Sequence, residues 1–284
     1  MPSQREIRRR IGSVGNIKQI TRAMQFVAAS KLKRAQDATL ASRPYSDKLD
    51  EVIADVAAVV DHEKHPLLAE ERDGPRLIVL FTTDRGLAGS LNTNTIRFAA
   101  REIAASTGEL TVVSVGRKGT AAMRRAHVPL AASFEGFGDR PSFSDVLPLA
   151  RLVSDDFLAG TYVKVHLLYP AFVSTLVQRP ELKRLLPVKP NPHAAEGIPG
   201  GQFIFEPDPG QVLSQLMPRY VATRLFQAVL ELTASEQSSR MVAMRNATDN
   251  AQDLIDDLTL TYNKVRQSNI TREMIEIATG ANST

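Results

Sequence analysis

The chain contains no cysteine and no tryptophan among its 284 residues. Without cysteine, disulfide bonds, thiolate metal sites and a cysteine nucleophile are all excluded. Long hydrophobic runs are missing as well: the apolar run Leu77–Phe81 is far shorter than the roughly 18 residues that a membrane-spanning helix needs. The sequence therefore predicts no membrane-spanning segment, and its 43% content of hydrophobic residues is ordinary for a globular chain.

Acidic residues are nearly absent from the first 36 residues, which carry nine basic side chains and only Glu6. This segment has a net charge of +8, so the rest of the chain sums to −4 within the total of +4. Three interpretations are open: a nucleic-acid-binding arm, a removable transit peptide, or a helix with an acidic partner surface. No aromatic residue precedes Phe26, and an apolar pattern runs unbroken from Ile7 to Ala35, which favours the third.

Proline and glycine are scarce at both ends of the chain. Residues 219–279 contain neither, and residues 3–43 contain no proline and only Gly12 and Gly15. Both segments are predicted to be long helices, with Pro44 kinking the first or ending its straight part. At about 1.5 Å per residue the second would extend roughly 90 Å, far more than a compact globule of this size, about 50 Å across. We therefore expect a protruding two-helix rod.

Apolar residues recur every seven positions in both predicted helices, which indicates an antiparallel, left-handed coiled coil between them. Near the C-terminus the two rows are Met244, Ala251, Leu258 and Val265, and Met241, Thr248, Ile255 and Tyr262. Near the N-terminus the row is Ile7, Val14, Thr21, Ala28 and Ala35, with Ile11, Ile17, Ile20, Met24, Val27 and Leu32 expected on the same side. Asp249, Asp253, Asp256 and Asp257 either face the basic residues Arg8, Arg9, Arg10, Lys18 and Arg22 across the seam or lie on a solvated face.

Between the predicted helices, strand and helix patterns alternate, which is typical of a parallel sheet covered by helices. Strands are expected at 76–83, 109–116 and 161–169, with an edge strand within 174–187, and helices at 94–105, 118–126 and 143–158. A loop rich in proline and glycine is expected at 189–201. The predicted fold class is thus α/β plus all-α, with a Rossmann-like domain at 74–190 inserted between the coiled-coil helices at 1–60 and 206–284.

The segment from Thr82 to Asn92, TTDRGLAGSLN, lies between a predicted strand and helix, where a nucleotide-binding fold places its phosphate loop. Neither glycine-rich phosphate motif is present, and Asp84 would set a carboxylate against a phosphate, so a plain turn is favoured. His62 and His65 have the spacing of a metal pair but lie beside a proline and charged residues, which favours an exposed helix end. No Ser/His/Asp constellation is legible, so no catalytic centre is predicted.

Several blocks of the sequence resemble the gamma subunits of F-type ATP synthases over nearly the whole chain. The blocks are Ile7–Gln36 (IRRRIGSVGNIKQITRAMQFVAASKLKRAQ), the Thr82–Asn92 loop, EPDP at Glu206–Pro209, and Ser238–Ala281. The chain departs from the family at Ala88, where many members have cysteine, and at Ser239, where alanine is usual. The regulatory insertion of chloroplast members is also missing, so thiol control is not expected.

The resemblance implies a central-stalk rotor shaft that turns with a ring of c subunits, driven by ions, and transmits this rotation to the catalytic ring. The implied partners are three alpha and three beta subunits, the epsilon subunit and the c-ring, with no nucleic acid. The implied chain has no catalytic site, cofactor or metal of its own. Because no transit sequence is recognisable, it resembles a bacterial member, located at the cytoplasmic face of the cell membrane and attached there indirectly through the c-ring.

The resemblance also assigns partner contacts. Contacts with the beta subunits are implied for Met24, Arg240, Arg266, Gln267 and Thr271, and for Arg85, Gly86, Leu87 and Ala88 from the inserted domain. The C-terminal tip 270–281, including Ile275 and Ile277, would lie in an apolar sleeve. Two other classes remain as alternatives: a nucleotide-dependent α/β enzyme with helical dimerisation arms, which would bind a nucleotide when purified alone, and a nucleic-acid-binding coiled-coil scaffold, whose binding would depend on salt.

Overall fold

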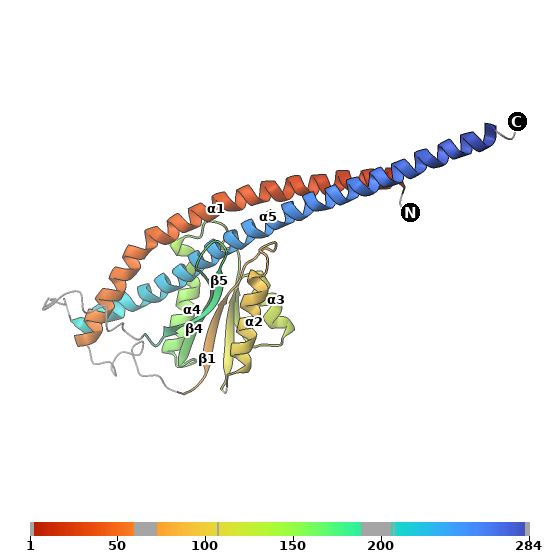
Figure 1. Cartoon of the computed structure of the whole chain (residues 1–284). Coiled ribbons are helices and arrows are strands. Elements are labelled where there is room, and N and C mark those ends of the chain that lie inside the picture. The colour runs from red at the N-terminus through yellow and green to blue at the C-terminus, as the bar shows by residue number, and fades with distance from the viewer. Residues whose placement is uncertain (1–2, 60–72, 107, 189–205, 207, 282–284) are drawn as a thin grey trace. The chain divides into compact units, whose positions relative to one another are not determined.

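The structure is a computed structural model that describes residues 3–59, 73–106, 108–188, 206 and 208–281 (Figure 1). By its internal contacts the chain divides into two units: Met1–Ala28 with Arg240–Thr284 form unit 1, and Ala29–Ser239 form unit 2. Two long helices, α1 (Gln4–Val59) and α5 (Pro209–Ala281), contribute to both units. The predicted long terminal helices are therefore confirmed, while the domain limits 1–60, 74–190 and 206–284 stay a prediction.

Unit 1 is an antiparallel pair of helices formed by the start of α1 and the second half of α5. Thr21 lies opposite Thr248 and Lys18 opposite Gln252, so the residue number rises along one helix as it falls along the other. The seven-residue rows lie on the inner side: Ile7 is 1% exposed, and Ala28, Met244 and Ala251 are also buried. The predicted antiparallel seam is thus present in this unit.

Part of the expected N-terminal stripe lies on the other side of α1. Ile17, Ile20 and Val27 are exposed, whereas Ile11 and Met24 are half-buried. The prediction that all of these apolar residues line one seam was wrong for the three exposed ones. In a helix with 3.6 residues per turn, positions 17, 20 and 27 form a second stripe, displaced from the row of Ile7 and Thr21.

Unit 2 is built around a five-stranded sheet with the order β3-β2-β1-β4-β5. Its strands are β1 (Arg76–Phe81), β2 (Leu110–Val115), β3 (Leu130–Phe134), β4 (Lys164–Phe172) and β5 (Gln178–Leu186). The first four are parallel, and β5 pairs antiparallel with β4 at the edge. Near-continuous burial of β1 is typical of a parallel strand covered on both faces.

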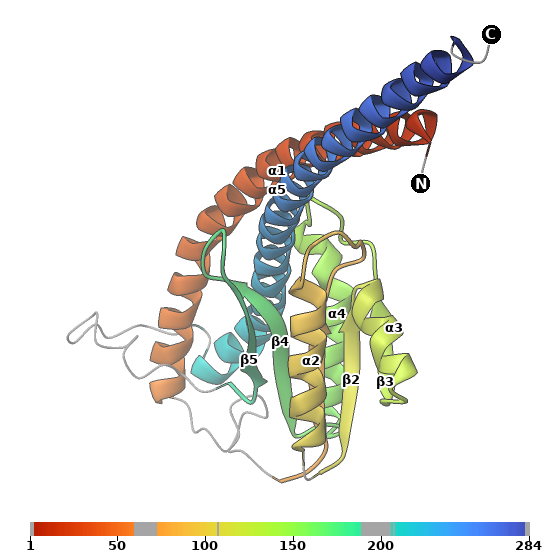
Figure 2. The same ribbon diagram turned by 45° about the vertical axis from the view of Figure 1, so that its right-hand side comes forward.

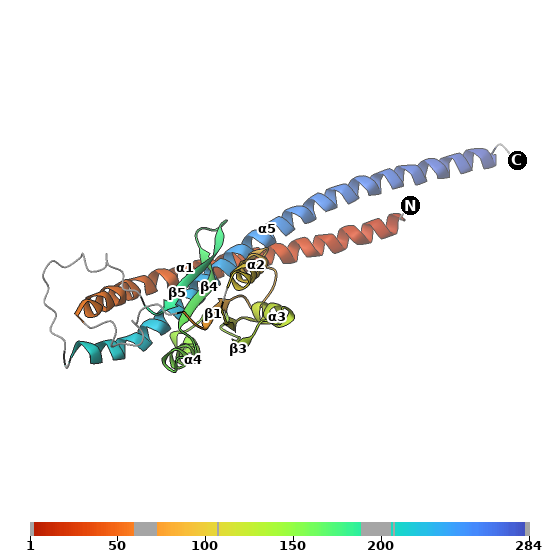
Figure 3. The same cartoon turned by 90° about the horizontal axis from the view of Figure 1, so that it is seen from below.

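Helices cover both faces of this sheet, as Figures 2 and 3 show for α2 and α4. On one face, α2 (Leu91–Ala104) and α3 (Arg117–Arg125) pack over Ile78, Leu80 and Val112. On the other face, α4 (Leu147–Leu158), preceded by the short 3₁₀ helix η2 (Phe143–Val146), shares one core with the unit-2 portions of α1 and α5. The α5 segment 209–239 thus serves as a covering layer of the α/β domain.

Most predicted elements are present, with shifted limits. The helix expected at 94–105 begins three residues earlier, the strand expected at 161–169 begins at Lys164, and β3 was not predicted. Both α1 and α5 continue through a proline, at Pro44 and Pro218. The carbonyls that lose a helical bond there belong to Leu40 and Ser214, which are exposed, so water can bond them. The loop expected at 189–201 lies outside the described residues.

Candidate functional site

The seam of unit 1 combines small and apolar residues with one buried polar pair. The hydroxyls of Thr21 and Thr248 are 2.8 Å apart. Each hydroxyl is also within hydrogen-bond distance of a carbonyl of its own helix: Thr21 can donate to Lys18, and Thr248 can donate to Met244. Lys18 donates to the side chain of Gln252, and not to an aspartate. Within the described part of the chain, no ion pair joins the predicted acidic cluster to the basic residues of α1.

Large apolar side chains are exposed along both helices of unit 1. On α1 they are Ile17, Ile20, Phe26 and Val27, and on α5 they are Leu254, Leu260, Ile270, Met274, Ile275 and Ile277. Monomeric proteins rarely leave so many large apolar side chains in contact with water, and extended apolar surface marks a contact with another protein. This part of the chain is therefore built to be covered by a partner.

The C-terminal end of α5 extends beyond the reach of α1. Opposed residue numbers sum to 270 for Lys18 and Gln252, so Gln4, the first residue of α1, lies opposite about Arg266. Of the predicted contact residues, Arg266, Gln267, Thr271, Ile275 and Ile277 are all exposed in this last stretch, whereas Met24 and Arg240 are half-buried. Among the described residues, α1 provides no helix that covers residues 267–277.

The loop between β1 and α2 has a defined shape fixed by side-chain hydrogen bonds. Thr83 Oγ1 donates to the carbonyl of Arg85 at 2.6 Å, and Asn92 Nδ2 donates to Thr83 Oγ1 at 2.8 Å. Leu87 has a φ of 61° and is 63% exposed. A leucine rarely adopts this left-handed conformation, so the surrounding contacts hold it there with its side chain outward.

The four predicted contact residues of this loop do not share one environment. Arg85, Gly86 and Leu87 are exposed, but Ala88 is 2% exposed. The carbonyl of Ala88 accepts a hydrogen bond from Ser239 Oγ at 2.7 Å. The two positions at which the chain departs from the family pattern are therefore in direct contact through the carbonyl of Ala88.

Asp84 fills an anion-binding position at the N-terminus of α3. Its carboxylate accepts the backbone N–H of Arg117, the first residue of α3, at 3.0 Å and that of Gly136 at 2.9 Å. Backbone N–H groups at a helix N-terminus favour an anion, and here the chain supplies its own. The remaining cavity at this edge has a volume of about 190 Å³, less than the roughly 300 Å³ of small ligand pockets. This geometry opposes nucleotide binding by the loop.

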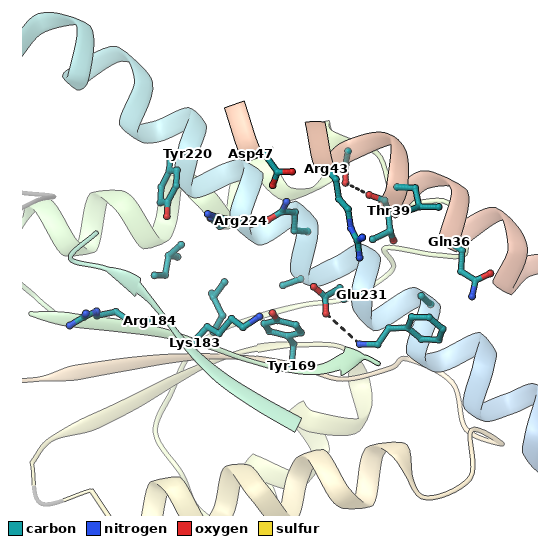
Figure 4. A pocket seen from close by; sticks show the side chains of 18 of the residues that line it. Gln36, Thr39, Arg43, Asp47, Tyr169, Lys183, Arg184, Tyr220, Arg224 and Glu231 are labelled. Atoms are coloured by element: carbon teal, nitrogen blue, oxygen red, sulfur yellow. Dashed lines mark hydrogen bonds between the residues drawn. The ribbon is translucent and has the colours of Figure 1, made fainter. Parts of the chain in front are cut away.

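A larger cavity of about 930 Å³ lies in unit 2 between α1, α5 and the β4–β5 strands (Figure 4). Two of the basic residues that line it are paired with neighbouring carboxylates: Arg224 bonds both carboxylate oxygens of Asp50, and Lys183 lies 2.9 Å from Glu181. Burial raises the pKa of Glu231, although nearby Lys183 and a hydrogen bond from the Phe172 N–H act in the opposite direction. The first pair joins α5 to α1, and the second lies within β5; neither forms a nucleophile–base constellation.

Metal binding has no support within the described ranges, where no group of three or more histidine, aspartate and glutamate side chains is placed to hold an ion. His62 and His65 lie outside those ranges. No helix in the described part of the chain is long and apolar enough to cross a membrane.

Some residues that organise the site were not predicted. Asp139, in the loop after β3, lies 2.6 Å from Lys31 Nζ of α1 and accepts a hydrogen bond from Gln237 of α5 at 3.2 Å. Ser235 donates to Pro170 in β4, and Ser238 donates to Thr175 between β4 and β5. The sequence signal for these contacts was the presence of serine and glutamine inside a helix. Such side chains compete with helix formation unless they find hydrogen-bond partners.

Comparison with known proteins identifies one family along nearly the whole chain. The family model described as ATP synthase matches residues 3–284. The ATP synthase gamma chain of Roseiflexus sp. (strain RS-1) is 50% identical over 287 residues, covering 99% of this chain and 98% of that protein. The ATP synthase gamma chain of Dehalococcoides mccartyi (strain CBDB1) is 47% identical over 287 residues, covering 99% of each.

Solved structures have the same fold. A chain of the mitochondrial ATP synthase central stalk and c-ring of Tetrahymena thermophila matches with a TM-score of 0.63 and 25% identity, covering 80% of this chain and 99% of that one. A chain of the Euglena gracilis mitochondrial ATP synthase OSCP/F1/c-ring structure in rotational state 3 matches with a TM-score of 0.68 and 19% identity, covering 99% and 94%.

A sheet domain inserted between two terminal helices that pair with each other, with apolar side chains left exposed along that pair, defines a rotor subunit of the central-stalk class. The chain belongs to the family of ATP synthase gamma chains. The resemblance seen in the sequence, and the central-stalk role that it implied, are thereby confirmed.

Proposed function

We propose that the chain couples two rings by rotating between them: a ring of c subunits driven by ions, and a catalytic ring of three alpha and three beta subunits. The observation that carries the proposal is the end of α5, residues 267–277, which exposes Ile270, Met274, Ile275 and Ile277 beyond the first residue of α1. An apolar helix end of this kind needs a surrounding protein surface. The epsilon subunit and the c-ring bind the inserted α/β domain and the helix segments that pack on it.

The mechanism follows from differential contacts. Each ion that crosses the membrane provides about 2.3 kcal/mol per 100 mV and turns the c-ring together with this chain. Because the surface of unit 1 differs around its circumference, each beta subunit meets a different face in turn, and these contacts shift its population between open and closed states. Apolar contacts suit the tip because they have no preferred direction and are remade at each step.

ATP is made or hydrolysed in the partner subunits, and the chain itself has no catalytic site. Two features of unit 2 support this assignment. Asp84 already fills the anion position at the start of α3, and Arg224 and Lys183 of the 930 Å³ cavity are each paired with a neighbouring carboxylate. The same features argue against the alternative of a nucleotide-dependent enzyme with helical arms.

The proposed contacts with the catalytic ring are those implied by the family, refined by exposure. Leu87, with Arg85 and Gly86, presents the loop to a beta subunit, whereas Ala88 contributes through its backbone. Further contacts with the catalytic ring are proposed for Met24, Arg240, Arg266, Gln267, Thr271, Ile275 and Ile277. Their position is consistent with this assignment because the last five are exposed.

The proposed location is the cytoplasmic face of a bacterial cell membrane, where the c-ring holds the chain. The similarity to the gamma chains of Roseiflexus and Dehalococcoides supports this location.

A photo-cross-link at the loop tip tests the rotor role. The chain has no natural cysteine, so Leu87→Cys can be labelled uniquely with a benzophenone maleimide in a complex whose other subunits lack accessible cysteines. Illumination is expected to attach the loop to a subunit of the catalytic ring and to stop both ATP hydrolysis and proton pumping, because a fixed shaft cannot turn. The control is the labelled complex kept in the dark, which should retain both activities. Full activity after a complete cross-link to that ring would refute the rotor role.

A further inference from the structure

One turn of α5, residues 235–239, bonds the end of β4 and three separate loops of the α/β domain. Ser235 Oγ donates to the carbonyl of Pro170 at 2.8 Å, and Ser238 Oγ donates to that of Thr175 at 2.7 Å, both in the β4–β5 hairpin. Ser239 Oγ donates to the carbonyl of Ala88, in the loop after β1, at 2.7 Å. Gln237 Nε2 donates to Asp139, in the loop after β3, at 3.2 Å.

These bonds leave the helix in different directions. Successive residues of an α-helix are rotated by about 100°, so Ser238 and Ser239 lie within about 60° of Ser235, whereas Gln237 lies about 160° away from it. Ser235 and Ser238 are fully buried and Gln237 is 1% exposed. Asp139 also contacts Lys31 of α1, which adds the second helix to the same assembly. This turn of α5 is therefore enclosed and bonded on opposite sides.

The three loops follow β1, β3 and β4, and so lie at the carboxyl edge of the parallel strands. Doubly wound folds bind their ligands at that edge. In this chain the edge binds a turn of the chain's own helix instead, and Asp84 fills the neighbouring anion position. The cavity left at this edge is lined on one side by Val229, Leu232, Thr233 and Glu236 of α5.

We propose that the α5 turn 235–239 and its three bonded loops, hereafter the collar, lock the rotation of α5 to that of the α/β domain. Ser235, Gln237, Ser238 and Ser239 are positioning residues in this collar, with Asp139 as the acceptor on the far side. Turning the helix relative to the sheet would break hydrogen bonds on both sides at once. The collar also holds Leu87 outward, because Ser239 fixes the neighbouring carbonyl of Ala88.

The inference rests on the proposed rotor function and adds the place where torque passes between the domain and the shaft helix. The domain receives torque from the ion-driven ring, and α5 continues as one helix from this turn to Ala281. A loosened collar would let the domain turn by some angle before α5 follows. Proton pumping under load would then be lost before ATP hydrolysis.

The test is the triple variant Ser235→Ala, Ser238→Ala and Ser239→Ala in the assembled complex. Alanine removes the three hydroxyls and favours the helix, so a loss of coupling or faster exchange cannot be attributed to weaker helix formation. The matched control is Thr39→Ala, Ser42→Ala and Ser214→Ala, which removes three hydroxyls of unit 2 that donate to carbonyls of their own helices. Hydrogen exchange, ATP hydrolysis and ATP-driven proton pumping are measured on both.

We expect amide exchange in residues 84–90 and 173–177 to accelerate by about fivefold for each lost bond in the triple variant and to stay unchanged in the control. Proton pumping against an imposed gradient should fall several-fold more than hydrolysis. Unchanged exchange would show that the serines do not hold the loops, and accelerated exchange with intact coupling would show that torque takes another path. Either result overturns the inference.

If the triple variant does not assemble, Ser238→Ala is compared with Ser238→Thr, which keeps a hydroxyl at that position. The inference then predicts lost coupling for alanine and retained coupling for threonine, and equal coupling in both would overturn it. The Leu87 photo-cross-link distinguishes a failure of the rotor role from a failure of the collar. If the cross-link stops the complex while the collar variants remain fully coupled, only the collar is wrong.

Discussion

At the scale of single residues, the structure depends on a few positions whose backbone or charge is unusual. Gly116 has a φ of 92°, and a Cβ added there would lie 2.0 Å from the carbonyl oxygen of Thr82. The sequence placed Gly116 at the end of a strand but did not show how closely β1 approaches. Leu87 is less expected still, because nothing in its residue type predicts a positive φ.

Gly116→Ala is predicted to lower the free energy of unfolding by about 3 kcal/mol or more, since it adds a backbone clash to the cost of a positive φ. Gly136→Ala is the matched control: its φ is 85°, but an added Cβ would meet no atom within 4 Å. The control should therefore lose only about 1–2 kcal/mol. Denaturant unfolding of the full chain measures both, and equal losses would contradict the proposed close approach of Thr82.

Glu231 gives a prediction about pH. Because its pKa in the folded chain is raised above the usual value of 4.5, the folded state binds more protons than the unfolded state just above that pH, and stability falls as pH rises through this window. Glu231→Gln removes this cost and keeps an oxygen acceptor for the Phe172 N–H. The free energy of unfolding of the variant minus that of the wild type should thus increase from pH 4.5 to pH 7.

The measurement for Glu231→Gln is denaturant unfolding at several pH values, with the exposed Glu109→Gln as control. A stability difference that stays constant or decreases with rising pH would show that burial does not dominate the environment of Glu231.

At the scale of elements, periodicity predicted the helices and the seam but not the role of every apolar residue. Ile7, Ala28, Met244 and Ala251 are buried as the seven-residue spacing requires. Ile17, Ile20 and Val27 were assigned to the same seam, yet they form a second, exposed stripe, because a helix that contacts both its partner helix and another protein has two apolar faces. Sequence spacing alone does not say which face meets which partner.

The sheet shows a similar limit. Strands β1 and β2 were predicted from buried β-branched runs, whereas β3, with the sequence LAASF, alternates between half-buried and exposed residues and has little β-propensity. The collar was not predicted either. Its bonds join residues between 63 and 151 positions apart, and side-chain hydrogen bonds over such separations leave no periodic signal.

The threonine pair of the seam can be tested by a double-mutant cycle. Thr21→Val and Thr248→Val are each predicted to lower the free energy of unfolding by about 1 kcal/mol, because each removes one hydroxyl of the buried pair and leaves the other without its cross-helix contact. The double variant should cost less than the sum, since two methyl groups of the same shape replace the pair. Thermal unfolding of the full chain measures the cycle, and simple additivity would mean that the two hydroxyls do not interact.

At the scale of the whole molecule, the account states that one chain turns as a shaft between two rings. The sequence supported this through the resemblance of its end blocks and its central loop, and the family match over residues 3–284 confirms that resemblance. The residues that contact each partner remain proposals, because the surfaces that would cover Ile275, Ile277 and Leu87 belong to other chains. Exposure identifies candidate contacts but does not identify the partner.

Direct observation of rotation tests this claim most simply. Ala104→Cys places a unique thiol at the exposed end of α2, to which a bead is attached while the catalytic ring is fixed to a surface. When ATP is added, the bead is predicted to turn steadily in one direction, with as many stopping positions per turn as there are beta subunits. A bead that only fluctuates about one angle, while ATP is hydrolysed at the full rate, would contradict the account.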